Sequence, residues 1–167
     1  MMWGKKRIAG TVYDLTHLDP FEIEVPKAGG DAILLQVQFG SHTFTEKYNP
    51  LHTPDLAISD GNGPLRAFCL NRYSHSLSLP AAVKQSVAGE VCLNQNRLNI
   101  AASLPGLNGP YLIAFTLRAK RTKKFDGVMT VVSAHHRPNM DLTLPCAPFR
   151  VVAAATLAGR KIDWKKK

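Results

Sequence analysis

The side chains best suited to chemistry lie in the segment VVSAHHRP, residues 131–138. If this segment is a strand, Ser133 and His135 share one face and Arg137 follows where the strand ends. Histidine exchanges protons near neutral pH, and arginine stabilises negative charge developing on a phosphate. The pattern predicts a phosphate-binding, acid–base site at a strand end. An ordinary polar strand end with surface histidines is the alternative.

Two further groups could contribute to such a site. In the segment FCLNRYSHS, residues 68–76, Arg72 and Tyr73 are the residue types that hold phosphates and stack on bases, and His75 adds an imidazole. Ser76 or Ser78 would equally serve as a helix-capping hydroxyl. His52 lies close in sequence to an aspartate and is a third candidate acid or base.

A basic stretch lies between two predicted strands. Residues 118–124 contain five cations and no acid: Arg118, Lys120, Arg121, Lys123 and Lys124. Lysine and arginine displace the counterions of a nucleic-acid backbone, so this loop predicts contacts to phosphates without sequence specificity. A solvated surface loop is the alternative.

The distribution of charge favours the same class of partner. The 167 residues carry a net charge of +9. Residues 1–84 hold 8 basic and 8 acidic groups, whereas residues 85–167 hold 13 basic and 4 acidic groups. The whole positive surplus therefore lies in the second half of the chain. A one-sided positive field attracts polyanions, and RNA or DNA is the expected partner. A basic surface that serves solubility is the alternative. Length and composition predict a single domain over residues 1–164, with a basic tail at 165–167.

Several other classes of protein lack support. The chain has no HExxH or comparable metal spacing, no glycine-rich phosphate loop and no nucleophile elbow, so neither a cofactor nor a metal is expected. It has no long apolar run and no signal-peptide core, so we expect a cytoplasmic protein without a membrane partner. Three widely spaced cysteines (Cys69, Cys92 and Cys146) predict reduced, buried thiols.

Frequent prolines and glycines favour short strands over long helices. Strands are predicted at residues 7–15, at 21–25, 32–39 and 43–45 as a meander, at 91–94 and 97–101 as a hairpin, at 111–118 and 128–135 as a long hairpin, and at 149–157. Residues 66–73 form a strand or a strand entering a helix, and Pro80 begins a helix over 81–88. The fold class is therefore α+β, a mainly antiparallel sheet of six to eight strands with one or two short helices.

The order of elements over residues 75–138, together with the VVSAHHRP segment, resembles the group of metal-independent ribonucleases that includes barnase, EndoU, colicin ribonucleases and RelE. Ser133 would take the place of a threonine, and His135 that of a tyrosine, in a motif that ends a sheet strand in many toxin members. The segments YDLTHLDPF, HTFT, HTPDL and FCLNRY are also similar to small bacterial proteins carried on plasmids and other mobile elements.

The resemblance implies cleavage of RNA by attack of the ribose 2′-OH on the adjacent phosphate. His135, His52 and His75 would be the candidate acids and bases, Arg72 and Arg137 would hold the phosphate, and Ser133 would donate a hydrogen bond. We expect His135, Arg72 and one further histidine to meet in a cleft beneath the basic hairpin. A DNA- or RNA-binding accessory protein without activity is the main alternative. An antitoxin- or immunity-type factor with a cognate protein partner is the other.

Overall fold

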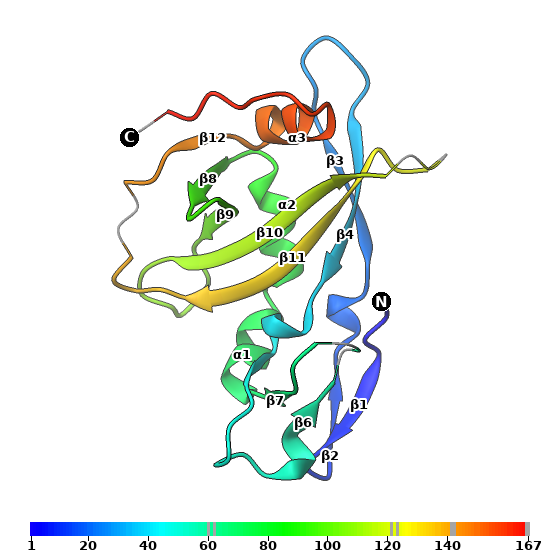
Figure 1. Cartoon of the computed structure of the whole chain (residues 1–167), viewed down its shortest axis with the longest axis vertical. Helices are drawn as coiled ribbons and strands as arrows, with labels where there is room; N and C mark the ends of the chain where they lie inside the picture. The colour runs from blue at the N-terminus through cyan, green and yellow to red at the C-terminus, as the bar shows by residue number, and fades with distance from the viewer. Residues whose placement is uncertain (60, 62, 121, 123, 141–142, 166–167) are drawn as a thin grey trace.

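The computed structural model describes residues 1–59, 61, 63–120, 122, 124–140 and 143–165. A seven-stranded sheet dominates it, with the order β12-β8-β9-β10-β11-β4-β3 (Figure 1). Its strands are β3 (Phe21–Val25), β4 (Ile33–Phe39), β8 (Glu90–Asn94), β9 (Arg97–Ala102), β10 (Tyr111–Ala119), β11 (Gly127–His136) and β12 (Cys146–Pro148). All neighbours are antiparallel except β11 and β4, which run parallel. The predicted α+β class is confirmed.

The two predicted hairpins of the main sheet are present. Gln95 and Asn96 both take positive φ values, 48° and 62°, and form the two-residue turn between β8 and β9. Asparagine tolerates this backbone region better than most residues, which is why the turn could be predicted. The long β10–β11 hairpin pairs Tyr111 with His136 at one end and Ala119 with Gly127 at the other.

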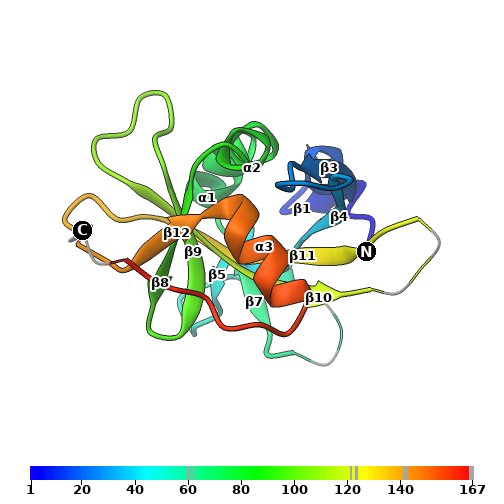
Figure 2. The ribbon, with the colours of Figure 1, turned by 90° about the horizontal axis from the view of Figure 1, so that it is seen from above.

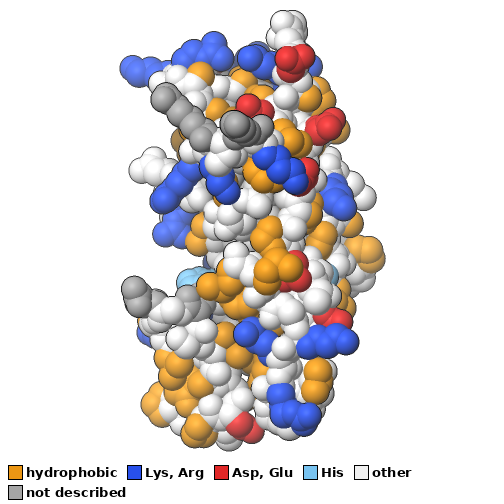
Figure 3. All heavy atoms as spheres, turned by 90° about the vertical axis from the view of Figure 1, so that its right-hand side faces the viewer, with side chains coloured by type: hydrophobic (Ala, Val, Ile, Leu, Met, Phe, Trp, Pro, Cys, Tyr) orange, Lys and Arg blue, Asp and Glu red, His pale blue; other side chains and the backbone are white. Residues whose placement is uncertain are grey.

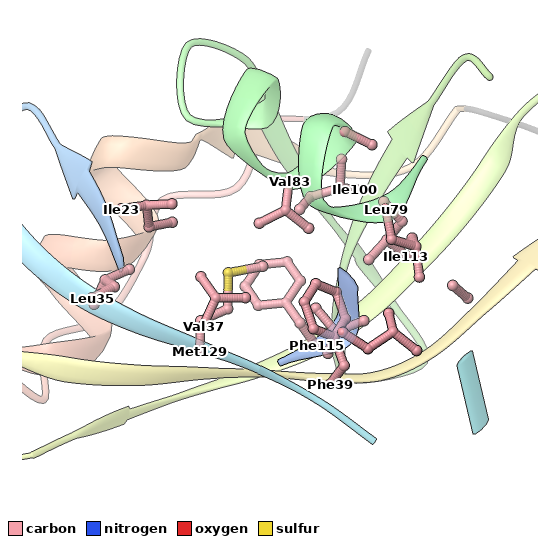
Figure 4. Packing of buried hydrophobic residues seen from close by; sticks show 14 of the residues in the cluster. Ile23, Leu35, Val37, Phe39, Leu79, Val83, Ile100, Ile113, Phe115 and Met129 are labelled. Atoms are coloured by element: carbon pink, nitrogen blue, oxygen red, sulfur yellow. The ribbon is translucent and has the colours of Figure 1, made fainter. Parts of the chain in front are cut away.

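Two helices, α2 (Leu79–Ser86) and α3 (Phe149–Leu157), cover one face of the main sheet. A third, α1 (Leu70–Ser76), contacts α2 and the turn at Ser41–Thr43. Leu79 and Val83 of α2 point toward Ile113 and Phe115 of β10 (Figure 4). From α3, Phe149 stacks on Phe115 with ring centroids 5.9 Å apart. Figure 2 shows α2 and α3 side by side above the sheet, so one apolar core lies between the helices and the strands.

A smaller unit lies below the main sheet. Strands β5 (Thr45–Lys47), β7 (Arg66–Phe68) and β6 (Ala57–Ile58) form a three-stranded sheet, and β1 (Lys5–Ile8) and β2 (Thr11–Asp14) form a separate hairpin (Figure 1). Trp3 joins this unit to the main core, because its indole nitrogen donates to the carbonyl oxygen of Phe39 at 2.9 Å. The Trp3 ring also meets the Phe44 ring edge-on at 4.9 Å.

Three predicted elements are corrected. Residues 7–15 are not one strand, since a turn at Ala9 and Gly10 divides β1 from β2. The third strand of the expected meander leaves the main sheet, because a 3-10 turn at Ser41–Thr43 redirects the chain and β5 pairs with β7. Residues 149–157 are helix α3 rather than a strand. Phe149, Val152 and Ala153 are all buried, at the helical spacing that packs one face on the core.

The prediction of reduced cysteines is wrong for two of the three. Cys92 and Cys146 face each other on β8 and β12 and form a disulfide, while Cys69 is free. Their spacing of 54 residues gave no sign of this pairing, which arises only when the two strands meet at the sheet edge. Lys165, assigned to a basic tail, pairs with Cys146 through two backbone hydrogen bonds of 2.9 and 3.1 Å, and residues 166–167 lie outside the described chain.

Candidate functional site

Two arginines from different elements share one backbone oxygen. The carbonyl of Thr45 accepts from Arg72 Nη1 at 2.8 Å and from Arg66 Nη2 at 3.2 Å. Arg72 Nη1 also donates to the carbonyl of His42 at 3.3 Å. Both of these bonds of Arg72 use Nη1, so within the described part of the chain its Nε and Nη2 groups are left for a ligand. Two guanidinium groups side by side favour an anion between or beside them.

His135 lies next to these arginines at the end of β11. Burial, together with the charges of cationic neighbours, lowers the pKa of His135 to about 4. Those neighbours, in decreasing order of effect, are Arg72, Arg137, His42 and Arg66. We call these five residues the arginine–histidine cluster. The cluster keeps His135 neutral at pH 7, and an anion bound among the cations would oppose their effect.

Arg137 extends the cluster toward open solvent. It is exposed and follows β11, where its backbone nitrogen donates to the carbonyl of Pro110 at 2.9 Å. Its neighbour His136 and Leu112 of β10 line a hollow of about 500 Å³ together with it. Arg137 is therefore the member of the cluster that a ligand in this hollow would contact.

A second pair of histidines lies on the helix-covered face. The ring of His75 on α1 meets those of Tyr111 and His136, with centroids 5.7 and 6.4 Å apart. Burial lowers the pKa of His75, and His136 lowers it further. The buried hydroxyl of Tyr111 has no hydrogen-bond partner among the described residues. Burial raises the pKa of Tyr111 to about 12, and the charge of Arg72 acts weakly in the opposite direction.

The structure separates the basic hairpin from the cluster. His135 lies at one end of β11 and the hairpin tip at the other, and His135 follows Gly127 by eight residues. At about 3.3 Å per residue this is about 26 Å, so the expected cleft beneath the hairpin is not formed. Arg118 is exposed near the tip. Arg121 and Lys123 lie outside the described residues.

Two cations of the hairpin already have partners. Lys124 forms an ion pair with Glu22 of β3, and Lys120 donates to Gln36 Oε1 at 3.0 Å. Both ammonium groups also lie over the ring of Phe125, at 5.2 and 5.8 Å from its centroid. The loop contains no acid in its own sequence, but in the folded protein Glu22 lies beside Lys124. An exposed ion pair of this kind is weak and can be displaced by a phosphate.

The remaining predicted residues fall in different places. Ser133 shares the face of His135, as expected from alternation, while Ala134 between them belongs to the core. Both ring nitrogens of His52 have partners within the small unit. Nδ1 accepts from the backbone nitrogen of Asn49 at 3.0 Å, and Nε2 lies 3.1 Å from Glu46. His52 therefore lies outside the arginine–histidine cluster.

Tyr73 also has a role within the fold. Its ring packs on those of Tyr13 and Phe68, and its hydroxyl donates to the carbonyl of Asp14 at 3.2 Å. Neither Ser76 nor Ser78 caps a helix: Ser78 makes no capping bond, and the hydroxyl of Ser76 donates to the carbonyl of Tyr73 at 2.7 Å. Among the described residues, no group of three or more His, Cys, Asp or Glu side chains is placed to hold a metal ion.

Sequence reasoning did not assign roles to Arg66 and Tyr111. Arg66 is the more informative omission, because an arginine in the run RAF is nine-tenths buried on a central strand. Arginine is rarely buried without a partner. An arginine within a predicted strand was therefore the sequence signal that could have pointed to a buried polar site. The part of His42 in the cluster depends on the turn at Ser41–Thr43.

The fold and the site together define a small α+β protein with a cationic cluster where its main sheet meets a smaller one. The chain belongs to the YjaZ family, whose family model matches residues 5–157. That match includes every residue of the arginine–histidine cluster. Comparisons with curated proteins and with solved structures give no significant match. No helix in the described part of the chain is long and apolar enough to cross a membrane.

Proposed function

We propose that this protein binds RNA through the arginine–histidine cluster and cleaves it without a metal ion. One observation carries the proposal: among the described residues, the charged groups that act on His135 are cations, and two of them, Arg72 and Arg66, share the carbonyl of Thr45. A phosphate bound beside Arg72 and Arg137 would be attracted by both of these charges. The resemblance of residues 75–138 to metal-independent ribonucleases points to the same reaction.

Each step of the reaction has a candidate group. Arg72 and Arg137 hold the non-bridging oxygens of the scissile phosphate. His135 is neutral at pH 7 and accepts the proton of the ribose 2′-OH as the 2′ oxygen bonds to phosphorus. The bond from phosphorus to the 5′ oxygen breaks, and His42, whose charge acts on His135, is the candidate to protonate that oxygen. The products are a 2′,3′-cyclic phosphate and a free 5′-hydroxyl.

Binding and catalysis are linked through the pKa of His135. In the free protein burial, and after it the charges of the arginines, hold this pKa low, which makes the imidazole a weak base. A phosphate monoanion among them offsets their charge, so the pKa rises toward 6.5 when RNA is bound. The base therefore strengthens only in the complex. This coupling needs no movement of the backbone.

The test is an assay of purified protein with a mixed-sequence RNA in the presence of EDTA. We expect cleavage to products with 2′,3′-cyclic phosphate ends, and no cleavage of DNA of the same sequence, which lacks the 2′-OH. The double variant Arg72→Ala/His135→Ala is expected to lose at least 100-fold in rate, the usual scale of general acid–base catalysis. The matched control, His52→Gln, removes a histidine outside the cluster and is expected to keep the activity.

Two results would decide against the proposal. Binding of RNA without any cleavage would favour the alternative of an accessory nucleic-acid-binding protein. Cleavage that is unchanged in the double variant would remove the cluster from the mechanism. Thermal unfolding of each variant shows whether it is folded at the assay temperature.

We propose the cytoplasm as the place of action, because RNA is the substrate. The Cys92–Cys146 disulfide is of a kind that persists in oxidising compartments. The proposal therefore requires that the reduced protein still folds, which the stability measurement described below examines.

A further inference from the structure

The end of the molecule opposite the cluster carries a second group of cations. Figure 3 shows Lys and Arg side chains gathered over the upper part of the molecule, where Figure 1 places the tip of the β10–β11 hairpin and the β3–β4 turn. A hollow of about 460 Å³ lies at this end, between α3, the β3–β4 turn and the C-terminal segment. Four of its lining residues are cations, Lys27, Arg150, Arg160 and Lys161, and one is an acid, Asp163.

These four cations are available to a ligand. All are exposed, and none forms an ion pair or a side-chain hydrogen bond with another described residue. They come from three separate segments of the chain, which the fold brings together. Arg160 is held at the end of α3, where its backbone nitrogen donates to the carbonyl of Ala155 at 2.8 Å. A cation at a helix C-terminus is favourably placed with respect to the helix dipole.

The hollow continues toward the basic hairpin. A neighbouring hollow of about 290 Å³ shares Lys27, Ala154 and Arg160 with it, and is also lined by Ala119 and Asp126 at the base of the hairpin. The carboxylate of Asp126 already accepts from the backbone nitrogen of Leu34 at 2.8 Å. We call the two hollows together the α3 groove.

We propose that the α3 groove is a second phosphate-binding subsite, which holds the RNA strand away from the point of cleavage. This inference rests on the proposed function, since it assumes that RNA is the ligand. The groove reaches Leu157, whose side chain packs against Gly127 so closely that an added Cβ there would lie 2.7 Å away. The groove and the cluster are therefore at opposite ends of β11, about 26 Å apart.

The separation sets the length of strand that can contact both places. At 3.4 Å per phosphate, the spacing along one strand of a duplex, about 26 Å corresponds to roughly eight nucleotides, and a strand with its phosphates further apart needs fewer. A trinucleotide is too short to reach both places, whereas a 16-nucleotide strand reaches both. The groove therefore contributes to the binding of long RNA and not to that of short RNA.

The experiment measures the dissociation constants of a trinucleotide and a 16-nucleotide RNA over a range of salt concentrations. The variant Arg150→Ala/Arg160→Ala removes two groove cations. Its matched control, Lys5→Ala/Arg7→Ala, removes two exposed cations of β1 at the other end of the molecule (Figure 1). For the 16-mer, we expect weaker binding and a salt slope smaller by roughly 1.4 in the groove variant, at about 0.7 per phosphate contact. The control and the trinucleotide should show no change.

The outcomes separate the two proposals. If the wild type binds both RNAs and the groove variant behaves like its control on the 16-mer, the subsite is wrong and the proposed function stands. If the groove variant weakens the trinucleotide equally, the groove is not a separate subsite. If neither RNA binds the wild type, the proposed function fails and the subsite fails with it.

Discussion

Arg72 of α1 and His135 of β11 lie close enough that the guanidinium charge lowers the pKa of the imidazole more than any other charged group does. The two residues are far apart in sequence, and the fold joins them by anchoring Arg72 on the carbonyl of Thr45 at 2.8 Å. The anchor fixes one end of the guanidinium and leaves the other for a ligand. This relationship is the basis of the phosphate site and gives the first prediction.

Replacing Arg72 by alanine should raise the pKa of His135 above its value of about 4, because the strongest cationic neighbour is removed. Burial still holds the value below 6.5. NMR titration of the imidazole protons measures the change. The variant Arg72→Lys keeps the charge and should leave the pKa low. Equal pKa values in the wild type and in Arg72→Ala would show that the two groups do not interact.

The stability of the protein should fall as the pH is lowered from 6.5 to 4. His135 is held neutral in the folded state, with a pKa of about 4, and its unfolded value is 6.5. Its contribution to stability is therefore fully present above pH 6.5 and is lost as the pH falls through that interval, by up to about 3 kcal/mol. Urea unfolding at several pH values measures this loss. The unfolding free energy of His135→Asn should depend less steeply on pH. The dependence that remains comes from His17 and His75, whose pKa values are also lowered. A wild type and a variant with parallel pH profiles would contradict the assignment.

Much of the fold followed from local patterns, and the failures have physical reasons. The Gln95-Asn96 turn and the β10–β11 hairpin form between residues that are close in sequence, so local patterns predicted both. Helix α3 was missed because its valines, threonine and phenylalanine favour strands, whereas the burial of Phe149, Val152 and Ala153 against the core overrides that preference. The sheet change at β5 depends on pairing with β7, which no local pattern encodes.

The site was predictable only in part. His135, Arg72 and Arg137 were all identified from residue type and from their position at element ends, and the structure brings them together. The basic hairpin was assigned to the same site because its charge is evident in sequence. Its distance from His135 is set by the length of β11, which separates the two. The charge of a segment does not indicate how far it lies from another site. Arg66 belongs to the cluster through Thr45, a contact between two strands of the small sheet.

Removing the disulfide should destabilise the protein without unfolding it. The Cys92–Cys146 bond closes a long loop and ties β12 to β8, so the double variant Cys92→Ser/Cys146→Ser should lose about 2–4 kcal/mol of unfolding free energy. Denaturant unfolding with and without a thiol reductant measures the effect. The reductant should shift the wild type and leave the variant unchanged. A wild type insensitive to reductant would mean that the bond does not form in solution.

Tyr111→Phe should be neutral or stabilising by up to about 2 kcal/mol. The hydroxyl of Tyr111 is buried and has no partner among the described residues, so its removal relieves a desolvation cost while the ring remains in the core. Thermal unfolding measures the change, and Phe115→Leu provides a comparison in which core packing is lost. A marked loss of stability in Tyr111→Phe would reveal a hydrogen bond to the hydroxyl.

The most direct test of the phosphate site is the pKa of His135 with and without RNA. The protein is titrated by NMR alone and then with a saturating trinucleotide whose 2′-hydroxyls are blocked by methylation, so that it cannot be cleaved. Binding among Arg72, Arg137 and His135 should raise the pKa of His135 from about 4 toward 6.5. Saturable binding that leaves this pKa unchanged would place the RNA elsewhere on the molecule and contradict the account.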